Sequence, residues 1–172
     1  MRLRLSLLCA VAVCASAAAA APAWKFYAND RFGVTADTPA SWVQQPPPAN
    51  DDGATFVSPD GKASIAIYGG YVMEDNAAAA LAARAAPNEG ERVTYTQRGA
   101  RTVTVSGFKG DKIFYRHSLL SCGAQVWSNV ELDYPADEKA ALDPIVAHVV
   151  ASLHSGVPAG MTCKQCGAPC KD

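Results

Sequence analysis

Four β-rich runs follow one another between residues 92 and 134, and they constrain the fold of this chain more than any other feature. The runs are "RVTYTQR", "RTVTVSGF", "GDKIFYRHSLL" and "GAQVWSNVELDY". Each alternates apolar with polar residues or is rich in β-branched residues, and short glycine-containing turns separate them. Connections this short join antiparallel neighbours, because a parallel neighbour needs a crossover of a dozen residues or more. The second half of the chain is therefore predicted to be an antiparallel meander.

The last of these runs sorts its side chains by parity. One set comprises Val126, Val130, Leu132 and Tyr134, and the other comprises Trp127, Asn129, Glu131 and Asp133. Alternate side chains of a strand point to opposite faces of a sheet. We therefore expect the first set to be buried and the second to be mostly in contact with water.

The first half of the chain also reads as β structure. A strand within residues 31–39 ends at Pro39, and a loop with three consecutive prolines follows it. Two further β-rich runs flank the segment Ser58-Pro59-Asp60-Gly61, which has the residue types of a hairpin turn.

A first helix is predicted within residues 73–90. Asp75 or Asn76 can cap it, and the alanines that follow favour helical backbone. Pro87, Asn88 and Gly90 end it. Its alanine-rich surface buries little area per residue, so this helix should pack closely but weakly.

A second helix is predicted within residues 136–153. Its helical stripe comprises Leu142, Ile145, Val146, Val149 and Leu153. Pro144 lies inside that pattern, which predicts either a kink or a helix that restarts with Asp143 as its cap. Packed on the sheet, this helix should bury Val126, Val130, Leu132, Ile145 and Val149.

The order of these elements resembles the PsbP/Mog-like fold family. The residues that carry the resemblance are "NDRFGVTADTPASW", "GATFVSPDGKASIAIYG" and "ELDYPADEKAALDPIVAHVVASL". The resemblance implies an α+β fold, with an antiparallel sheet of about six to seven strands and two helices packed on it as an α/β/α sandwich. Its members include a thylakoid photosystem II subunit, a nuclear Ran-binding protein and exported bacterial proteins, and they are mostly binding or assembly modules without a shared active site.

The first twenty residues have the features of a secretory signal peptide. Arg2 and Arg4 precede an apolar run, and Ala18 and Ala20 satisfy the small-x-small rule for cleavage. Lipidation at Cys14 is disfavoured because the branched Val13 precedes it. No other stretch approaches the length of a membrane span. We therefore expect a periplasmic or secreted protein that is not inserted in a membrane after the signal is removed.

The charge of the mature chain argues against two classes of partner. Removal of the signal lowers the Lys and Arg count from 15 to 13 against 16 acidic residues, a formal charge of about −3. Nucleic acids and anionic membranes both require a basic stripe, which is absent here. The expected organisation is a signal peptide at 1–20, a PsbP/Mog-like domain at 21–154 and a cysteine-rich tail at 155–172.

The tail admits three interpretations. Cys163, Cys166 and Cys170, with Cys122 or His154, could supply four ligands to zinc or copper. Cys163 and Cys166 could instead form a redox dithiol, although such motifs usually lie at a helix N-terminus. In an oxidising compartment, however, disulfides are the expected state of four cysteines.

Chain geometry favours the disulfide interpretation. The second helix must return along the sheet after the strand at 124–134, so that it ends near Cys122. One tail cysteine should therefore join Cys122. Cys163 is the nearest along the chain, and a compact turn separates Cys166 from Cys170. We thus favour Cys122–Cys163 with Cys166–Cys170, although four cysteines allow three connectivities.

The chain lacks the common sequence signatures of catalysis. Neither a nucleophile elbow, a phosphate-binding loop, a dinucleotide fingerprint nor a zinc-protease motif occurs in it. Cys122 and His117 lie close in sequence, but no third group orients them, so a disulfide is the better reading of that cysteine. No enzyme activity and no cofactor are expected.

The function predicted from these observations is an exported, non-enzymatic protein-binding or assembly module. The candidate partner surface is a sheet face or the proline loop, with Trp42, Pro46, Pro47, Pro48 and Trp127 as its residues. Packing of Trp42 and Trp127 against the helices is an equally open alternative. The alternative is a periplasmic metal-binding or thiol-redox protein that acts through the tail.

The mature chain is predicted to begin at Ala21. The intact mass of the exported protein tests this. A mass that retains Cys14 together with a diacylglycerol would instead indicate a membrane-anchored lipoprotein.

Overall fold

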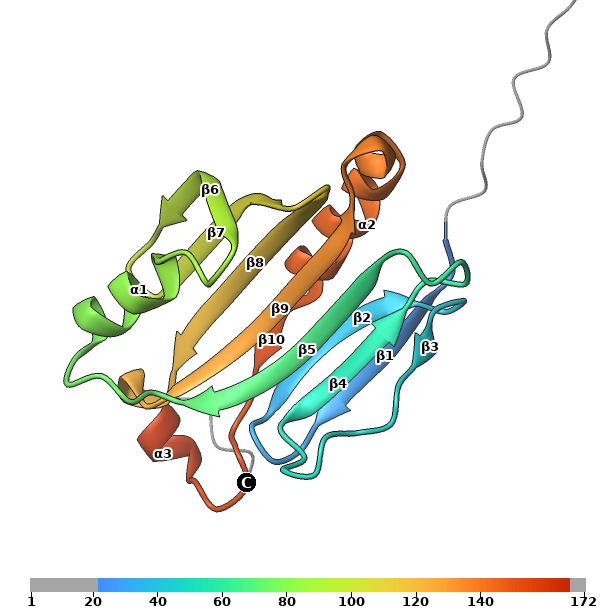
Figure 1. Cartoon of the computed structure of the whole chain (residues 1–172). Helices are drawn as coiled ribbons and strands as arrows, with labels where there is room; N and C mark the ends of the chain where they lie inside the picture. The colour runs from blue at the N-terminus through green and yellow to red at the C-terminus, as the bar shows by residue number, and fades with distance from the viewer. Residues whose placement is uncertain (1–21, 168–172) are drawn as a thin grey trace, which may run out of the picture.

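The computed structural model describes residues 22–167, so the predicted signal peptide and Cys170 lie outside the described residues. Two sheets and two main helices make up this part of the chain (Figure 1). The strands are β1 (Trp24–Asn29), β2 (Val34–Pro39), β3 (Val43–Gln44), β4 (Gly53–Val57), β5 (Ser64–Tyr71), β6 (Glu91–Arg98), β7 (Thr102–Lys109), β8 (Lys112–Ser121), β9 (Val126–Pro135) and β10 (His154–Ser155). The helices are α1 (Ala77–Ala85), α2 (Lys139–Ser152) and the single-turn α3 (Cys163–Cys166), with 3-10 turns η1 (Cys122–Ala124) and η2 (Ala136–Glu138).

The larger sheet is antiparallel throughout, in the order β3-β4-β5-β9-β8-β7-β6. It contains the predicted meander, and its seven strands agree with the number expected. The predicted hairpin joins β4 to β5, where the Gly61 amide donates to the Ser58 carbonyl at 2.9 Å. Gly61 has a φ of 75°, a conformation that glycine adopts without steric cost.

A second sheet, with the order β1-β2-β10, was not expected. The predicted strand at 31–39 is β2, but it belongs to this smaller sheet rather than to the large one. β1 and the two-residue β10 pair with its two edges. Neither flanking strand alternates strongly between apolar and polar residues, so the sequence pattern alone does not reveal them. Their pairing with β2 places them in the sheet.

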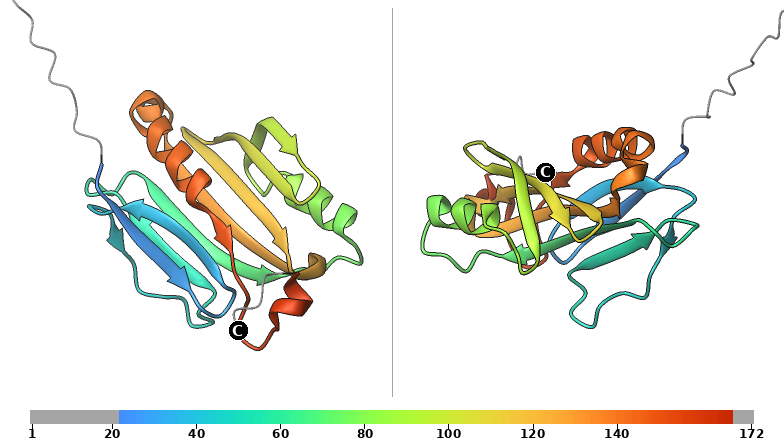
Figure 2. Two further views of the ribbon diagram at one scale, coloured as in Figure 1. Left: turned by 180° about the vertical axis from the view of Figure 1, so that it is seen from behind. Right: turned by 45° about the horizontal axis from the view of Figure 1, so that its top comes forward.

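The small sheet and α2 cover one face of the large sheet, and α1 lies on the other (Figure 2). The main core lies under α2 and the small sheet, where Ile65 and Ile67 of β5 lie opposite Leu132 and Val130 of β9. Val149 of α2 is fully buried against them. Ile145 was expected to be buried but is only half-buried, at the margin of this core.

Val126 is fully buried, but not beneath α2 as predicted. It packs with Phe32 and Cys122 at the end of the sheet, next to the tail. The helix passes over the other half of β9, so the single core expected from the sequence is divided into separate clusters.

The opposite face of β9 is not mostly exposed, which corrects the parity prediction. Trp127 and Asn129 are 3% and 1% exposed, while Glu131 and Asp133 are half-buried. α1 packs Ala80 against this face and covers Trp127. Both faces of the central strands are therefore buried over part of their length.

The helix termini follow local chemistry. Asn76 caps α1, because its side chain accepts a hydrogen bond from the Ala79 amide at 2.9 Å. α2 is one continuous helix that contains Pro144, so the predicted restart at that residue is wrong. Asp143 instead pairs with Lys139, four residues before it. None of the helices within residues 22–167 is long and apolar enough to cross a membrane.

Val149→Ala should lower the free energy of unfolding by about 1 to 3 kcal/mol, from lost transfer energy and the cavity left behind. Urea denaturation measures the loss. Val43→Ala is the matched control, since Val43 is 60% exposed and should change stability by no more than about 0.5 kcal/mol. Equal effects at the two positions would show that α2 does not pack as described.

Candidate functional site

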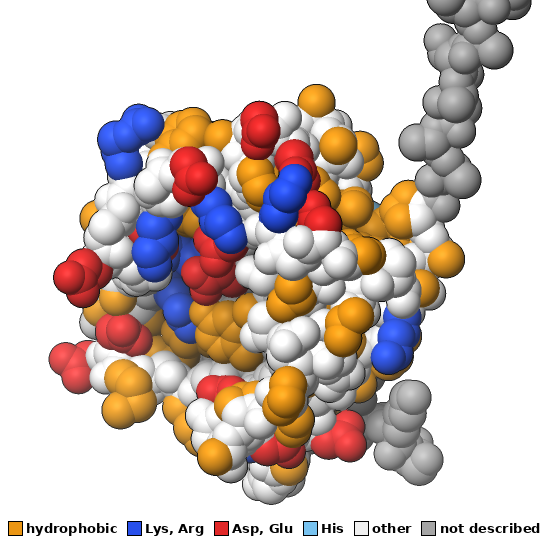
Figure 3. Space-filling model, turned by 45° about the vertical axis from the view of Figure 1, so that its right-hand side comes forward, with side chains coloured by type: hydrophobic (Ala, Val, Ile, Leu, Met, Phe, Trp, Pro, Cys, Tyr) orange, Lys and Arg blue, Asp and Glu red, His pale blue; other side chains and the backbone are white. Residues whose placement is uncertain are grey.

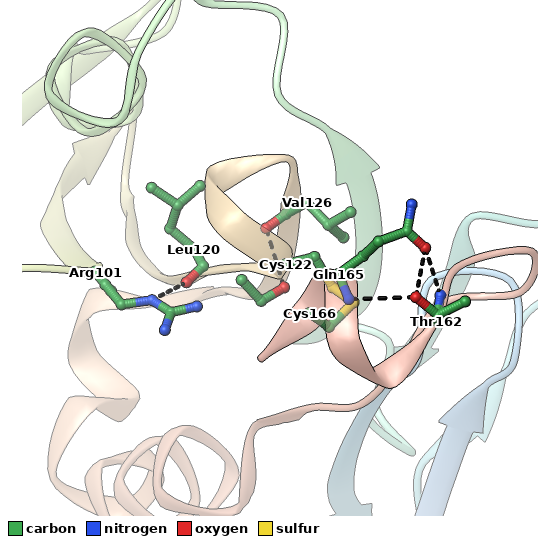
Figure 4. The surroundings of a disulfide bond; sticks show 8 residues. Arg101, Leu120, Cys122, Val126, Thr162, Gln165 and Cys166 are labelled. Atoms are coloured by element: carbon green, nitrogen blue, oxygen red, sulfur yellow. Dashed lines mark hydrogen bonds between the residues drawn. A yellow bond between two sulfur atoms is a disulfide. The ribbon is translucent and has the colours of Figure 1, made fainter. Parts of the chain in front are cut away.

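A disulfide joins the tail to the end of the large sheet (Figure 4). Cys122 follows β8 and is fully buried, and it is bonded to Cys166, 44 residues later. Thr162 begins α3 with a capping box. Its hydroxyl accepts from the Gln165 amide at 3.3 Å, and the Gln165 side chain accepts from the Thr162 amide at 2.8 Å. This helical turn places Cys166 against the buried cysteine.

The tail is thus joined to Cys122 as expected, but the predicted partner was wrong. Cys122 pairs with Cys166 rather than Cys163, which also excludes the proposed Cys166–Cys170 bridge. The prediction assumed an extended tail whose first cysteine reaches Cys122. Instead, Met161 packs beside Cys122 and the chain then turns, so the last residue of α3 faces the sheet. Cys163 is itself disulfide-bonded.

The cysteine positions bear on the alternative functions. With Cys122 and Cys166 bonded together and Cys163 in a disulfide, these sulfurs are not thiolates in this state. Thiolates are what both a soft metal and a redox nucleophile require. Within residues 22–167, no group of three His, Cys, Asp or Glu residues is arranged to hold a metal.

The backbone at Cys122 is unusual. Cys122, Gly123 and Ala124 have φ angles of 49°, 64° and 68°, so three consecutive residues are left-handed. Such a conformation costs on the order of 1 to 3 kcal/mol for a residue other than glycine. The reversal from β8 to β9 is completed in this turn, and the disulfide ties its first residue to α3.

A polar groove lies on the face of the large sheet that is opposite α2, between α1 and the proline loop. We define its floor as Thr55, Ala66, Tyr68, Glu131 and Asp133, all half-buried. One hollow of about 250 Å³ beside Tyr68 is bounded by Pro46 and Pro48, and another of about 270 Å³ is bounded by Arg84, Tyr71 and Met73. Figure 3 shows acidic and basic side chains gathered around a hollow on this side, with hydrophobic side chains at its floor.

The charges in the polar groove are unevenly neutralised. Arg116 is buried and pairs with Glu91 at 2.8 Å, and it also donates to the Ala86 carbonyl at 3.0 Å. Glu131 accepts a hydrogen bond from the Tyr68 hydroxyl at 3.3 Å. Among the described residues, neither Glu131 nor Asp133 forms an ion pair. Burial raises the pKa of both carboxyls.

Two other features border these carboxyls. Arg84 of α1 lies over the rings of Tyr68 and Trp127, 5.8 and 5.6 Å from their centroids. Asn129 donates to the Tyr68 carbonyl at 3.2 Å, but its buried Oδ1 has no hydrogen-bond partner among the described residues. The parity of β9 directs Asn129 to the same face as Glu131.

The structure divides the residues predicted for a partner surface. Trp42 and Trp127 are 9% and 3% exposed and belong to the cores, although Trp127 also lines the hollow beside Arg84. Trp42 packs under the small sheet, and α1 covers Trp127. Pro46, Pro47 and Pro48 are exposed, and two of them border the polar groove.

Sequence reasoning missed the exposed apolar residues at the other wall. Tyr71 is 54% and Met73 is 88% exposed, just before α1. The available signal was a Tyr-Val-Met run directly after a strand and before a helix cap. The parity of β9 predicts only that Glu131 and Asp133 lie on a solvent-exposed strand face.

Comparisons with known proteins identify the fold. No protein-family model and no curated protein matches the chain. The structure is similar to PsbP from the cyanobacterium Synechocystis sp. PCC 6803, with a TM-score of 0.58 and 10% identity over 84% of this chain and 99% of that one. It is also similar to the Ran-binding protein Mog1p of Saccharomyces cerevisiae, with a TM-score of 0.52 and 10% identity over 78% of this chain and 96% of that one. The chain therefore has the α+β, PsbP/Mog-like fold that its sequence resembles, and identities this low establish the fold alone.

Peptide mapping without reduction should recover a fragment pair that joins Cys122 to Cys166. Cys166→Ala should then lower the free energy of unfolding by about 4 kcal/mol in the chain-entropy account of a loop this long. Lys164→Ala is the control, because this exposed neighbour on α3 should change stability by no more than about 0.5 kcal/mol. A fragment that joins Cys122 to Cys163 would contradict the pairing.

Proposed function

We propose that this protein is an exported, non-enzymatic binding module that holds a partner protein in the polar groove. The observation that carries the proposal is the pair Glu131 and Asp133, two half-buried carboxyls without an ion pair among the described residues. Arg116 is engaged by Glu91 and the Ala86 carbonyl. Lys109 and Lys112 act on Asp133 without forming an ion pair with it, so burial still dominates the raised pKa of both carboxyls. A basic side chain of the partner would complete this arrangement.

Exposed apolar side chains support a protein partner rather than a small cation. Tyr71 and Met73 stand at one wall of the polar groove, and Pro46 and Pro48 stand at the other. Aromatic residues and methionine are enriched at protein interfaces. The matching partner segment carries a Lys or Arg flanked by apolar residues.

The non-enzymatic assignment is supported by the location of the histidines. His117 bonds to the Thr104 hydroxyl at 2.7 Å, and His148 bonds to Asp37 at 2.9 Å and stacks on Trp24. Both lie on the α2 side of the sheet, away from the polar groove. Mog1p is described as a Ran-binding protein, so the same fold supports protein binding in that case.

Export is supported by the signal-like residues 1–20 and by the disulfide chemistry of the tail. The Cys122–Cys166 disulfide joins the tail to the sheet, and a periplasmic or otherwise oxidising compartment would keep this bond intact. The partner should therefore belong to the same compartment.

Site-directed photocrosslinking in the native host tests the proposal. A photoreactive residue at Met73 should crosslink to one protein, whereas the same residue at Lys25, exposed on β1, should not. Glu131→Gln with Asp133→Asn should abolish the crosslink and weaken binding of the purified partner by about tenfold or more. Asp30→Asn with Asp143→Asn is the matched control, because it removes two exposed carboxylates on the other side of the large sheet.

The pH dependence provides a second readout. Because burial raises the pKa of Glu131 and Asp133, these groups become neutral at a higher pH than ordinary carboxyls. Affinity for a basic partner segment should therefore fall as the pH is lowered from 7 through that raised range. Affinity that is unchanged by the double substitution would overturn the proposal.

A further inference from the structure

The disulfide-linked tail encloses a second hollow, distinct from the polar groove. After β10, the Gly156 amide bonds to the Gly33 carbonyl at 2.7 Å, and the chain then turns back through α3 to Cys122. Between this path and the ends of β7 and β8 lies a hollow of about 410 Å³, which we call the tail pocket. Its lining includes Arg101, Leu119, Ser155, Gly156 and Cys166. This volume falls within the range of small-molecule sites.

Arg101 is held at the rim of the tail pocket by the backbone. Its Nε donates to the Leu120 carbonyl at 2.9 Å, which fixes the guanidinium across from the Cys122–Cys166 bridge (Figure 4). Within residues 22–167, its two outer nitrogens have no hydrogen-bond partner. Arg101 is also the one charged residue among the described residues that line the pocket. Among residues 22–167, Arg101 is thus an exposed, oriented cation at the hollow that forms no ion pair.

The remaining lining combines apolar surface with the hydroxyl residues Thr102, Ser121 and Ser155. Leu119 and the two bridged cysteines provide apolar surface, and Gly156 presents no side chain. The Oγ of Ser155 is buried and has no hydrogen-bond partner among the described residues. A buried hydroxyl without a partner is costly unless a ligand or water satisfies it.

From this arrangement we infer that the tail pocket binds a carboxylate carried on a short apolar group. The planar fork of an arginine matches the two oxygens of a carboxylate. A single cation also suits one negative charge better than the two of a phosphate monoester. The apolar lining accepts the group attached to the carboxylate. Such a carboxylate belongs either to the C-terminus of a peptide chain or to a small organic acid.

The disulfide has a specific role in this inference. Cys166 forms part of the wall opposite Arg101, and its bond to Cys122 holds that wall in place. The pocket should therefore exist only while the bridge is intact. This inference does not depend on a partner in the polar groove.

NMR titration of the full mature chain tests the inference. Three probes are compared: sodium hexanoate, the peptide acetyl-Ala-Leu with a free carboxylate, and the same peptide with a C-terminal amide. The resonances of the Arg101 Nε–H and of the Ser155 and Gly156 amides should shift with at least one carboxylate and not with the amide. Binding of the peptide acid alone identifies a peptide C-terminus as the ligand, and binding of hexanoate identifies a small acid.

Variants separate binding from folding. Arg101→Gln should weaken carboxylate binding by about tenfold or more, since a bond to a charged group is lost. Arg92→Gln is the matched control, because Arg92 is exposed at the far end of β6. Reduction with dithiothreitol should abolish binding in a chain that still gives a folded spectrum.

Several outcomes would overturn the inference. The first is that neither carboxylate shifts these resonances up to about 10 mM, which corresponds to no useful affinity. The second is that inorganic phosphate produces equal shifts. The third is that Arg101→Gln binds the carboxylate as tightly as the unchanged protein. If the reduced chain unfolds, the Arg101→Gln comparison in the oxidised chain decides the matter alone.

Discussion

The fold depends on burial of both faces of the central β8–β9 pair. Val130 and Leu132 face α2, while Phe114 and Trp127 face α1. Two ten-residue strands that are buried on both sides over part of their length need a cover on each face, because exposed apolar area costs on the order of 25 cal/mol per Å². The helices and the small sheet supply these covers. Everything else in the described chain is arranged around this pair.

The polar groove exists because one of these covers is short. α1 has nine residues, most of them alanine, so it packs closely over part of the sheet and leaves β5 and the second half of β9 uncovered. The uncovered floor carries Tyr68, Glu131 and Asp133 beside the small Ala66, rather than large apolar residues. Partial burial there makes the carboxyls harder to ionise, because it raises the pKa of both.

The tail closes the other end of the sheet. The left-handed turn at Cys122 stores conformational strain, and the bridge to Cys166 fixes the turn and α3 together. β10 and the bond from Gly156 to Gly33 attach the same segment to the small sheet. The tail pocket is thus a product of chain closure, and it lies apart from the polar groove.

Sequence by itself determined the features that rest on local chemistry. The meander, the hairpin at Ser58–Gly61, the Asn76 cap and the return of α2 toward Cys122 all follow from strand parity, turn residues and element length. Tertiary structure alone decided the second sheet, the burial of Trp42 and Trp127, and the choice of Cys166 over Cys163. A strand's alternation specifies that its two faces differ, but not what will cover either one. Likewise, cysteine spacing limits which bridges are possible, whereas a single helical turn in the tail decided which sulfur reached Cys122.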